Sequence, residues 1–140
     1  MTAATGMFAG HGFTGATVDA IAGSAGVNMR MINHYFGDKC GLYVAVLEEL
    51  LGELREAELH PIKGPGSATD GLIGIYQTIF DHFGNSPQLV RSLSTENVMF
   101  ARFLKSSVAT PVVASLSLRN IEALLKRGQQ DGSIRRKIVF

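Results

Sequence analysis

The chain has 140 residues, the length of one domain, of which 46% are hydrophobic and 18% are charged. This composition excludes a disordered segment, and the net charge of +1 excludes recognition of a polyanion by bulk charge alone. The single cysteine, Cys40, cannot form an internal disulfide, no apolar run is long enough to span a membrane, and the N-terminus lacks a signal-peptide pattern. We therefore expect a soluble cytoplasmic protein without membrane contact.

The charge is unevenly distributed along the sequence. Residues 1–46 and 67–110 each have a net charge of zero, residues 47–66 carry −3 and residues 111–140 carry +4. The basic excess at the C-terminal end is compatible with a nucleic-acid patch and with a solvated helix end.

Residues 17–36, TVDAIAGSAGVNMRMINHYF, have the spacing of a helix-turn-helix. Ala22 is small enough for the closest approach of two helices, and Gly26 tolerates the positive φ of a tight turn. Val27 and Ile32 would anchor the second helix, whose outer face is then free to enter a major groove. The glycines of GHGFTG, just upstream, are expected in the turn between the first two helices.

Polar side chains that suit DNA lie on the outer face of this second helix. The residues on this face are Asn28, Met29, Arg30, Asn33 and His34. Arginine pairs with guanine, and asparagine pairs with adenine or phosphate. Thr17 and Asn28 are expected helix caps, and Asn28 would leave the first N–H groups of its helix facing a phosphate. The spacing by itself also fits a surface helix in an unrelated α-helical bundle.

The following segments predict more helices and no sheet. An apolar stripe indicates a helix over residues 39–59, and HPIKGPG at 60–66 predicts a break. Ser67 and Asp70 form a start signal for a helix that would end at Gly84–Asn85 in a left-handed cap.

Three start signals follow in the second half of the chain. Ser86–Pro87 predicts a short helix, Thr95 is expected to cap another that runs to Val108, and Thr110–Pro111 starts a helix that Gly132 ends. The sequence as a whole predicts about seven helices.

Two stretches carry a residue pattern at fixed offsets, MFAGHGFTGATVDAIAGSAGVN and INHYFGDKCGLYVAVLEE. The pattern consists of Phe8, Gly12–Phe13, Thr17–Val18, Ile21–Ala22, Ala25–Gly26–Val27, Phe36, Asp38–Lys39 and Leu42. In these residues the N-terminal segment resembles the DNA-binding domain of the TetR family of transcriptional repressors. Asn28 and Asn33 stand where the family commonly has Ser and Tyr.

The resemblance implies an all-α fold with a three-helix helix-turn-helix domain at 1–46 and a partial helical effector-binding and dimerisation domain at 47–140. It implies that Asn28, Met29 and Arg30 face bases. Contacts to the DNA backbone would come from Thr17, Asn33, His34, Tyr35 and Lys39. Tyr35 fits a core position equally well.

The second half resembles the family's variable effector-binding half more loosely, in NSPQLVRSLSTENVMF and KRGQQDGSIRRKI. Such a half holds a small-molecule pocket among its helices. Candidate lining residues are Tyr76, Phe80, Phe83, Asn97, Phe100 and Phe103. A phenylalanine-rich stripe at helical spacing also fits an ordinary core.

By this resemblance the protein is a ligand-responsive repressor that binds a double-stranded DNA operator, takes an unknown small-molecule effector and is a homodimer in its full-length form. The family's first helix starts before the position of Met1, and two dimer helices follow the position of Phe140. We therefore expect weak, half-site DNA binding and self-association through exposed apolar surface. The alternative is an effector-binding or interaction module without productive DNA binding.

No residue pattern indicates catalysis, a cofactor or a metal. None of the four histidines has a partner at metal-ligand spacing, and GHGFTG lacks the lysine of a phosphate-binding loop. Cys40 is expected to be a small packing residue.

Overall fold

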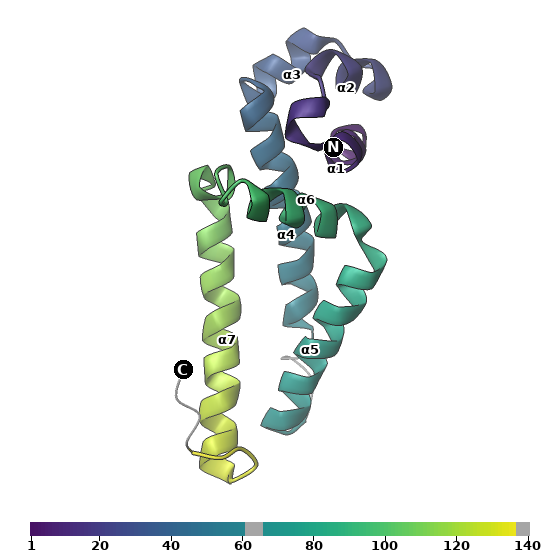
Figure 1. Ribbon diagram of the computed structural model, residues 1–140. Helices are drawn as coiled ribbons and strands as arrows, with labels where there is room; N and C mark the ends of the chain where they lie inside the picture. Colours follow the sequence, from purple (N-terminus) through teal and green to yellow (C-terminus); the bar gives the residue numbers. More distant parts are fainter. Residues whose placement is uncertain (61–65, 137–140) are drawn as a thin grey trace. The chain divides into compact units, whose positions relative to one another are not determined.

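The computed structural model describes residues 1–60 and 66–136, with the side chains of residues 110–117 outside the description. These residues form α-helices, one short 3-10 helix and no strand, which confirms the predicted all-α fold. The elements are α1 (Thr2–Gly15), α2 (Val18–Ala25), α3 (Met29–Phe36), α4 (Lys39–Leu59), α5 (Ala68–Asn85), α6 (Pro87–Val98), η2 (Leu104–Ser106) and α7 (Ala109–Asp131) (Figure 1). No helix in the described ranges is both long and apolar enough to cross a membrane.

The helices group into two compact units. Unit 1 comprises residues 1–51 and 86–110, and therefore contains α1 to α3, the first part of α4, and α6. Unit 2 comprises the rest of α4, α5 and the part of α7 that follows residue 110. The units divide the chain differently from the domain boundary expected after residue 46, which stays a prediction.

The start of each helix of the predicted helix-turn-helix is capped by a side chain. The Thr17 hydroxyl oxygen accepts a hydrogen bond from the Ala20 N–H at 3.2 Å. The Asn28 side-chain oxygen accepts one from the Arg30 N–H at 2.8 Å. Both predicted caps are confirmed, and each satisfies an N–H group that has no partner within the helix.

The turn between α2 and α3 depends on Gly26, which has a φ of 66°. The Val27 N–H donates to the Ala22 carbonyl at 3.1 Å, which closes the helix in a Schellman arrangement. Only glycine adopts this backbone conformation without cost, so the predicted role of Gly26 is confirmed.

The backbones of α3 and α4 approach each other closely at the corner between the two helices. The Asp38 carboxylate accepts a hydrogen bond from the Gly41 N–H at 2.8 Å and so caps α4. A Cβ atom on Gly41 would lie 2.0 Å from the Phe36 carbonyl oxygen, a backbone atom that cannot move aside cheaply. The two helices can therefore meet at this angle only because residue 41 is glycine.

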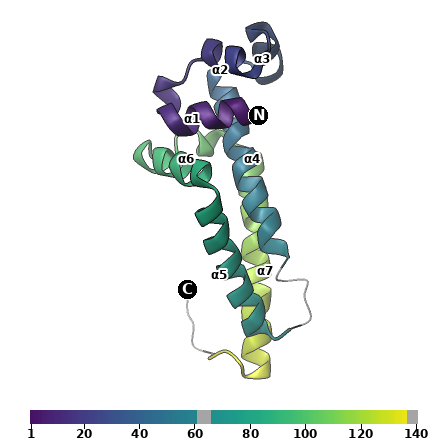
Figure 2. The same cartoon turned by 90° about the vertical axis from the view of Figure 1, so that its right-hand side faces the viewer.

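Four aromatic side chains form the centre of unit 1. The Phe13 ring lies 4.3 Å from Phe103 and 5.2 Å from Tyr43, measured between ring centroids. Tyr43 also contacts Phe8 at 4.9 Å and Phe103 at 5.0 Å, both edge-on. We call these four residues the aromatic cluster; it joins α1, the first part of α4 and the segment that follows α6. In both views α6 lies beside α1 (Figures 1 and 2).

The segment after α6 differs from the sequence prediction. Thr95 does not start a helix; it lies inside α6, and its hydroxyl donates to the Arg91 carbonyl at 3.0 Å. The prediction of a cap there was wrong, because a threonine hydroxyl can also bond the carbonyl four residues earlier within the same helix.

Past Val98 the chain makes a turn in which Phe100 and Ala101 have φ angles of 56° and 55°. Such conformations cost non-glycine residues about 1–3 kcal/mol each.

Unit 2 contains the predicted capping box at the start of α5. The Ser67 hydroxyl accepts from the Asp70 N–H at 3.1 Å, and the Asp70 carboxylate accepts from the Ser67 N–H at 3.0 Å. The Ser67 hydroxyl also donates to the Asp70 carboxylate at 2.7 Å. This bond, followed by the one from the Ser67 N–H, holds the pKa of Asp70 below its ordinary value. The left-handed cap expected at Gly84–Asn85 was wrong, because α5 includes Asn85 and α6 begins two residues later.

The N-terminal end of α5 meets the C-terminal half of α7 (Figure 2). A Cβ on Gly71 would lie 3.0 Å from a methyl carbon of Leu124, and one on Gly128 would lie 3.1 Å from the Cβ of Ala68. Glycine at these two positions lets the backbones of α5 and α7 approach closely.

Beyond α7, Gly132 has a φ of 83°, which confirms it as the residue that ends the helix. Most of the break expected at 60–66 lies outside the described residues.

The Gly41 corner makes a testable prediction. We expect Gly41→Ala to lower the free energy of unfolding by about 1–3 kcal/mol, as overpacking against fixed atoms does. Gly6→Ala is the matched control, because nothing lies within 4 Å of a Cβ there and Gly6 is inside α1. The control should be neutral or stabilising by up to about 1 kcal/mol. Urea denaturation followed by circular dichroism measures both, and equal stability of the two variants would contradict the account.

Candidate DNA-binding site

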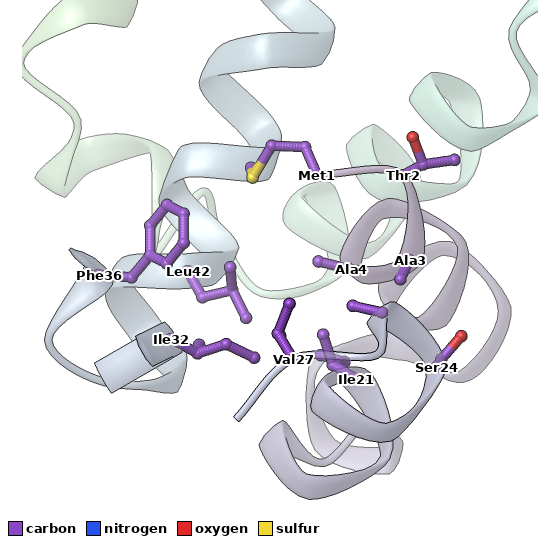
Figure 3. A pocket seen from close by; sticks show the side chains of 11 residues that line it. Met1, Thr2, Ala3, Ala4, Ile21, Ser24, Val27, Ile32, Phe36 and Leu42 are labelled. Carbon is purple, nitrogen blue, oxygen red and sulfur yellow. The ribbon is translucent and has the colours of Figure 1, made fainter. Parts of the chain in front are cut away.

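Helix α3 has one inner side and a wide exposed side. Ile32 is 6% exposed, and its side chain points into a hollow of about 660 Å³ that Phe36, Val27 and Leu42 also line (Figure 3). Residues of the first turn of α1 line the other side of this hollow (Figure 3). Val27, expected to be a buried anchor, remains 38% exposed at its edge. The rest of α3 therefore faces solvent.

The residues predicted to contact bases lie together at the N-terminal end of α3. Asn28, Met29 and Arg30 are all exposed. The Asn28 side-chain oxygen accepts one hydrogen bond in the cap, which leaves its second lone pair and its two amide N–H donors available to a ligand. Asn28 can thus donate to a phosphate or to a base acceptor while it caps α3.

The residues predicted to contact the DNA backbone are divided between three elements. Thr17 precedes α2, and Asn33, His34 and Tyr35 lie on α3; all four are exposed. Tyr35 is 72% exposed and its ring meets the His34 ring edge-on at 5.3 Å. The alternative that Tyr35 is a core residue was therefore wrong.

Lys39 differs from the other predicted contacts because its side chain is already held. Its ammonium group lies 4.7 Å from the centre of the Phe13 ring and donates to the Thr14 carbonyl at 3.5 Å. The cation is therefore positioned by α1, in the segment just before the Thr17 cap. A half-buried lysine in this position presents its charge at a defined point rather than on a freely moving stem.

The residues expected to line an effector pocket are distributed over both units. On α5, in unit 2, Tyr76 is 69% exposed and stacks on Phe80 with ring centroids 6.5 Å apart; Phe80 and Phe83 are also exposed. Asn97 and Phe100, in unit 1, are exposed as well. Of the six, only Phe103 is buried, and it belongs to the aromatic cluster. An effector pocket at these residues stays a prediction.

Sequence reasoning missed the structural roles of two residues and misplaced a third. Gly41 sets the angle between α3 and α4, and its only signal was a glycine in the first turn of a predicted helix. Glu96 is 1% exposed, and nothing in the sequence indicated that a glutamate would be buried there. Cys40 was expected to pack inside, but it is exposed.

Comparison with known proteins shows where this architecture belongs. The family model described as "Bacterial regulatory proteins, tetR family" matches residues 1–46, and "Tetracyclin repressor-like, C-terminal domain" matches residues 69–140. The chain belongs to the TetR family. The resemblance noted in the sequence is thereby confirmed.

Several TetR-family relatives align over much of the chain. It is 28% identical over 135 residues to the HTH-type transcriptional repressor NicS of Pseudomonas putida, covering 96% of this chain and 64% of NicS. It is 33% identical over 98 residues to the HTH-type transcriptional repressor SCO4008 of Streptomyces coelicolor, covering 70% of this chain and 47% of that protein. The chain thus spans about half to two thirds of the length of these relatives.

Solved structures share the fold. The TetR family regulator PfmR from Thermus thermophilus aligns with a TM-score of 0.74 at 21% identity, covering 95% of this chain and 71% of PfmR. A putative transcriptional regulator from Pseudomonas aeruginosa aligns with a TM-score of 0.69 at 26% identity, covering 94% of this chain and 64% of that one.

The contribution of the Asn28 cap to stability can be measured by mutation. We expect Asn28→Ala to lower the free energy of unfolding by about 1 kcal/mol, because α3 loses its cap. Asn28→Ser keeps a capping oxygen and should stay close to the parent in stability. Chemical denaturation monitored by circular dichroism compares them. If the alanine and serine variants were equally stable, the cap would contribute nothing.

Proposed function

We propose that this TetR-family protein is a sequence-specific DNA-binding transcriptional regulator, a ligand-responsive repressor that reads a double-stranded DNA operator with α3. The observation that carries the proposal is the division of α3 into an inner side, held by Ile32, and an exposed side that carries amide, guanidinium and imidazole groups. A helix anchored in this way is free to enter a major groove.

The residues then act in two sets. Asn28, Met29 and Arg30 face the bases, and Arg30 is the best suited to specify one, because its guanidinium matches the two acceptors of guanine. The other set contacts phosphates and fixes the register of α3 in the groove; it consists of Thr17, Asn33, His34, Tyr35 and Lys39. The capped starts of α2 and α3 add backbone N–H groups near the phosphates.

The low charge of the recognition segment limits the electrostatic part of binding. Residues 1–46 contain only two Lys or Arg side chains, Arg30 and Lys39. Since each neutralised phosphate contributes a slope of about −0.9, we expect log K to fall with log salt with a slope no steeper than about −2 per bound chain. Affinity therefore depends on a few well-placed contacts rather than on a basic surface.

The proposal extends to partners and place of action. NicS and SCO4008 are both described as transcriptional repressors, which supports repression as the outcome of DNA binding. A homodimer would place two α3 helices on successive half-sites of an operator. A small-molecule effector, taken up by the helical region described by the second family model, would release the DNA. We place the protein in the cytoplasm, with no membrane partner.

The role of Arg30 provides the test. A duplex bound by the chain is first selected from a random-sequence library, and fluorescence anisotropy then compares the parent with Arg30→Ala. We expect the variant to lose about 1–3 kcal/mol of discrimination at one base position.

Lys126→Ala is the matched control, because it removes one exposed cation from α7 in unit 2. It should leave affinity for the selected duplex unchanged. The proposal fails if selection enriches no sequence, or if Arg30→Ala binds the selected duplex and its base-substituted versions as the parent does.

A further inference from the structure

The turn that follows α6 is held by a buried carboxylate. Glu96 accepts hydrogen bonds at one oxygen, Oε2, from the backbone N–H groups of Phe103 at 3.2 Å and Leu104 at 3.0 Å. The Ala101 N–H donates to the Glu96 backbone carbonyl at 2.7 Å. The backbone carbonyl and the side-chain carboxylate of Glu96 therefore both accept hydrogen bonds from the same turn. Glu96 therefore closes a turn that contains two left-handed non-glycine residues, Phe100 and Ala101.

The closed turn places Phe103 in the aromatic cluster. Phe103 is 4% exposed and its ring lies 4.3 Å from Phe13 and 5.0 Å from Tyr43. The Tyr43 hydroxyl and the second oxygen of Glu96 are both buried without a hydrogen-bond partner among the described residues. Burial, and then the negative charge of Glu96, raise the pKa of Tyr43 to about 12, so the phenol keeps its proton near the carboxylate.

Phe13 in turn contacts the predicted DNA-binding surface. Its ring supports the Lys39 ammonium at 4.7 Å, and the same ammonium donates to the carbonyl of the next residue, Thr14. A contiguous series of contacts thus runs from Glu96 through Phe103 and Phe13 to Lys39. All of these residues belong to unit 1.

We propose that Glu96 is a positioning residue for DNA binding: by closing the turn at 99–104 it holds Phe103 against Phe13, and Phe13 holds the Lys39 ammonium where it meets a phosphate. This inference rests on the proposed function, because it gives Lys39 a phosphate partner. Glu96 itself does not touch DNA. Its effect depends on the placement of one ring and one cation.

The first arm of the test needs no DNA. The side-chain methylene protons of Lys39, observed by NMR on ¹³C-labelled protein, report the Phe13 ring through its ring-current shift. In Glu96→Ala and Phe103→Leu this shift should move toward the value of an unstructured lysine. Glu96→Gln keeps an oxygen that accepts both N–H bonds and should restore the parent shift.

The second arm measures binding to a random-sequence duplex of defined length across a salt series. Loss of one positioned phosphate contact should weaken binding by Glu96→Ala about three- to tenfold and reduce the magnitude of the salt slope by about 0.9. Leu89→Ala is the control, since Leu89 is a buried residue of α6 outside the aromatic cluster. It lowers stability but should change neither the Lys39 shift nor the slope.

The outcomes separate the two proposals. If the parent binds no duplex, the proposed function fails, while the Lys39 shift still decides whether Glu96 positions that side chain. If folded Glu96→Ala keeps the parent shift and salt slope, or if Leu89→Ala changes both to the same extent, Glu96 is not a positioning residue and the inference is overturned.

Discussion

The packing of Phe103 against Phe13 is the interaction on which the rest of unit 1 depends. These rings, with Phe8 and Tyr43, come from α1, from the first part of α4 and from a segment about ninety residues further along the chain than Phe13. Buried aromatic side chains each remove about 150–250 Å² from water, so the cluster buries several hundred Å² at one place in unit 1. Helix α1, which carries Phe8 and Phe13, contacts α2, and α2 contacts α3, so the cluster supports these short helices through α1.

This arrangement explains how α3 can leave so much of its surface exposed. Its own contribution to the core is mainly Ile32, and a helix of that length is marginal in isolation. The Asn28 cap, the Gly26 turn and the close corner at Gly41 fix where α3 begins and ends. Local geometry thus orients α3. The aromatic cluster holds together α1 and the first part of α4, the two helices between which α2 and α3 lie in the sequence.

Much of the structure around α2 and α3 was predictable from the sequence, because it depends on interactions between residues that are close in the chain. The caps at Thr17, Asn28 and Ser67 and the positive φ of Gly26 each depend on residues within five positions, and all four are confirmed. The TetR pattern itself was readable because its residues stand at fixed offsets.

The features that sequence reasoning missed depend on contacts between distant segments. Whether Glu96 is buried depends on a turn several residues away and on Tyr43, and neither leaves a signal near Glu96. Phe103 and Phe80 look alike in sequence, but Phe103 is covered by α1 and α4 whereas Phe80 is 68% exposed. The corner at Gly41 likewise depends on the position of the Phe36 carbonyl, which only the fold determines.

Native-state hydrogen exchange of Phe103→Ala shows whether the DNA-binding helices and α6 form one cooperative unit. We expect that protection of the slowest amides of α1, the first part of α4 and α6 falls by the same factor, and that α2 and α3 open with them. If only the amides of residues 99–104 lost protection while α1 to α3 exchanged as in the parent, the aromatic cluster would not be the support of the DNA-binding helices.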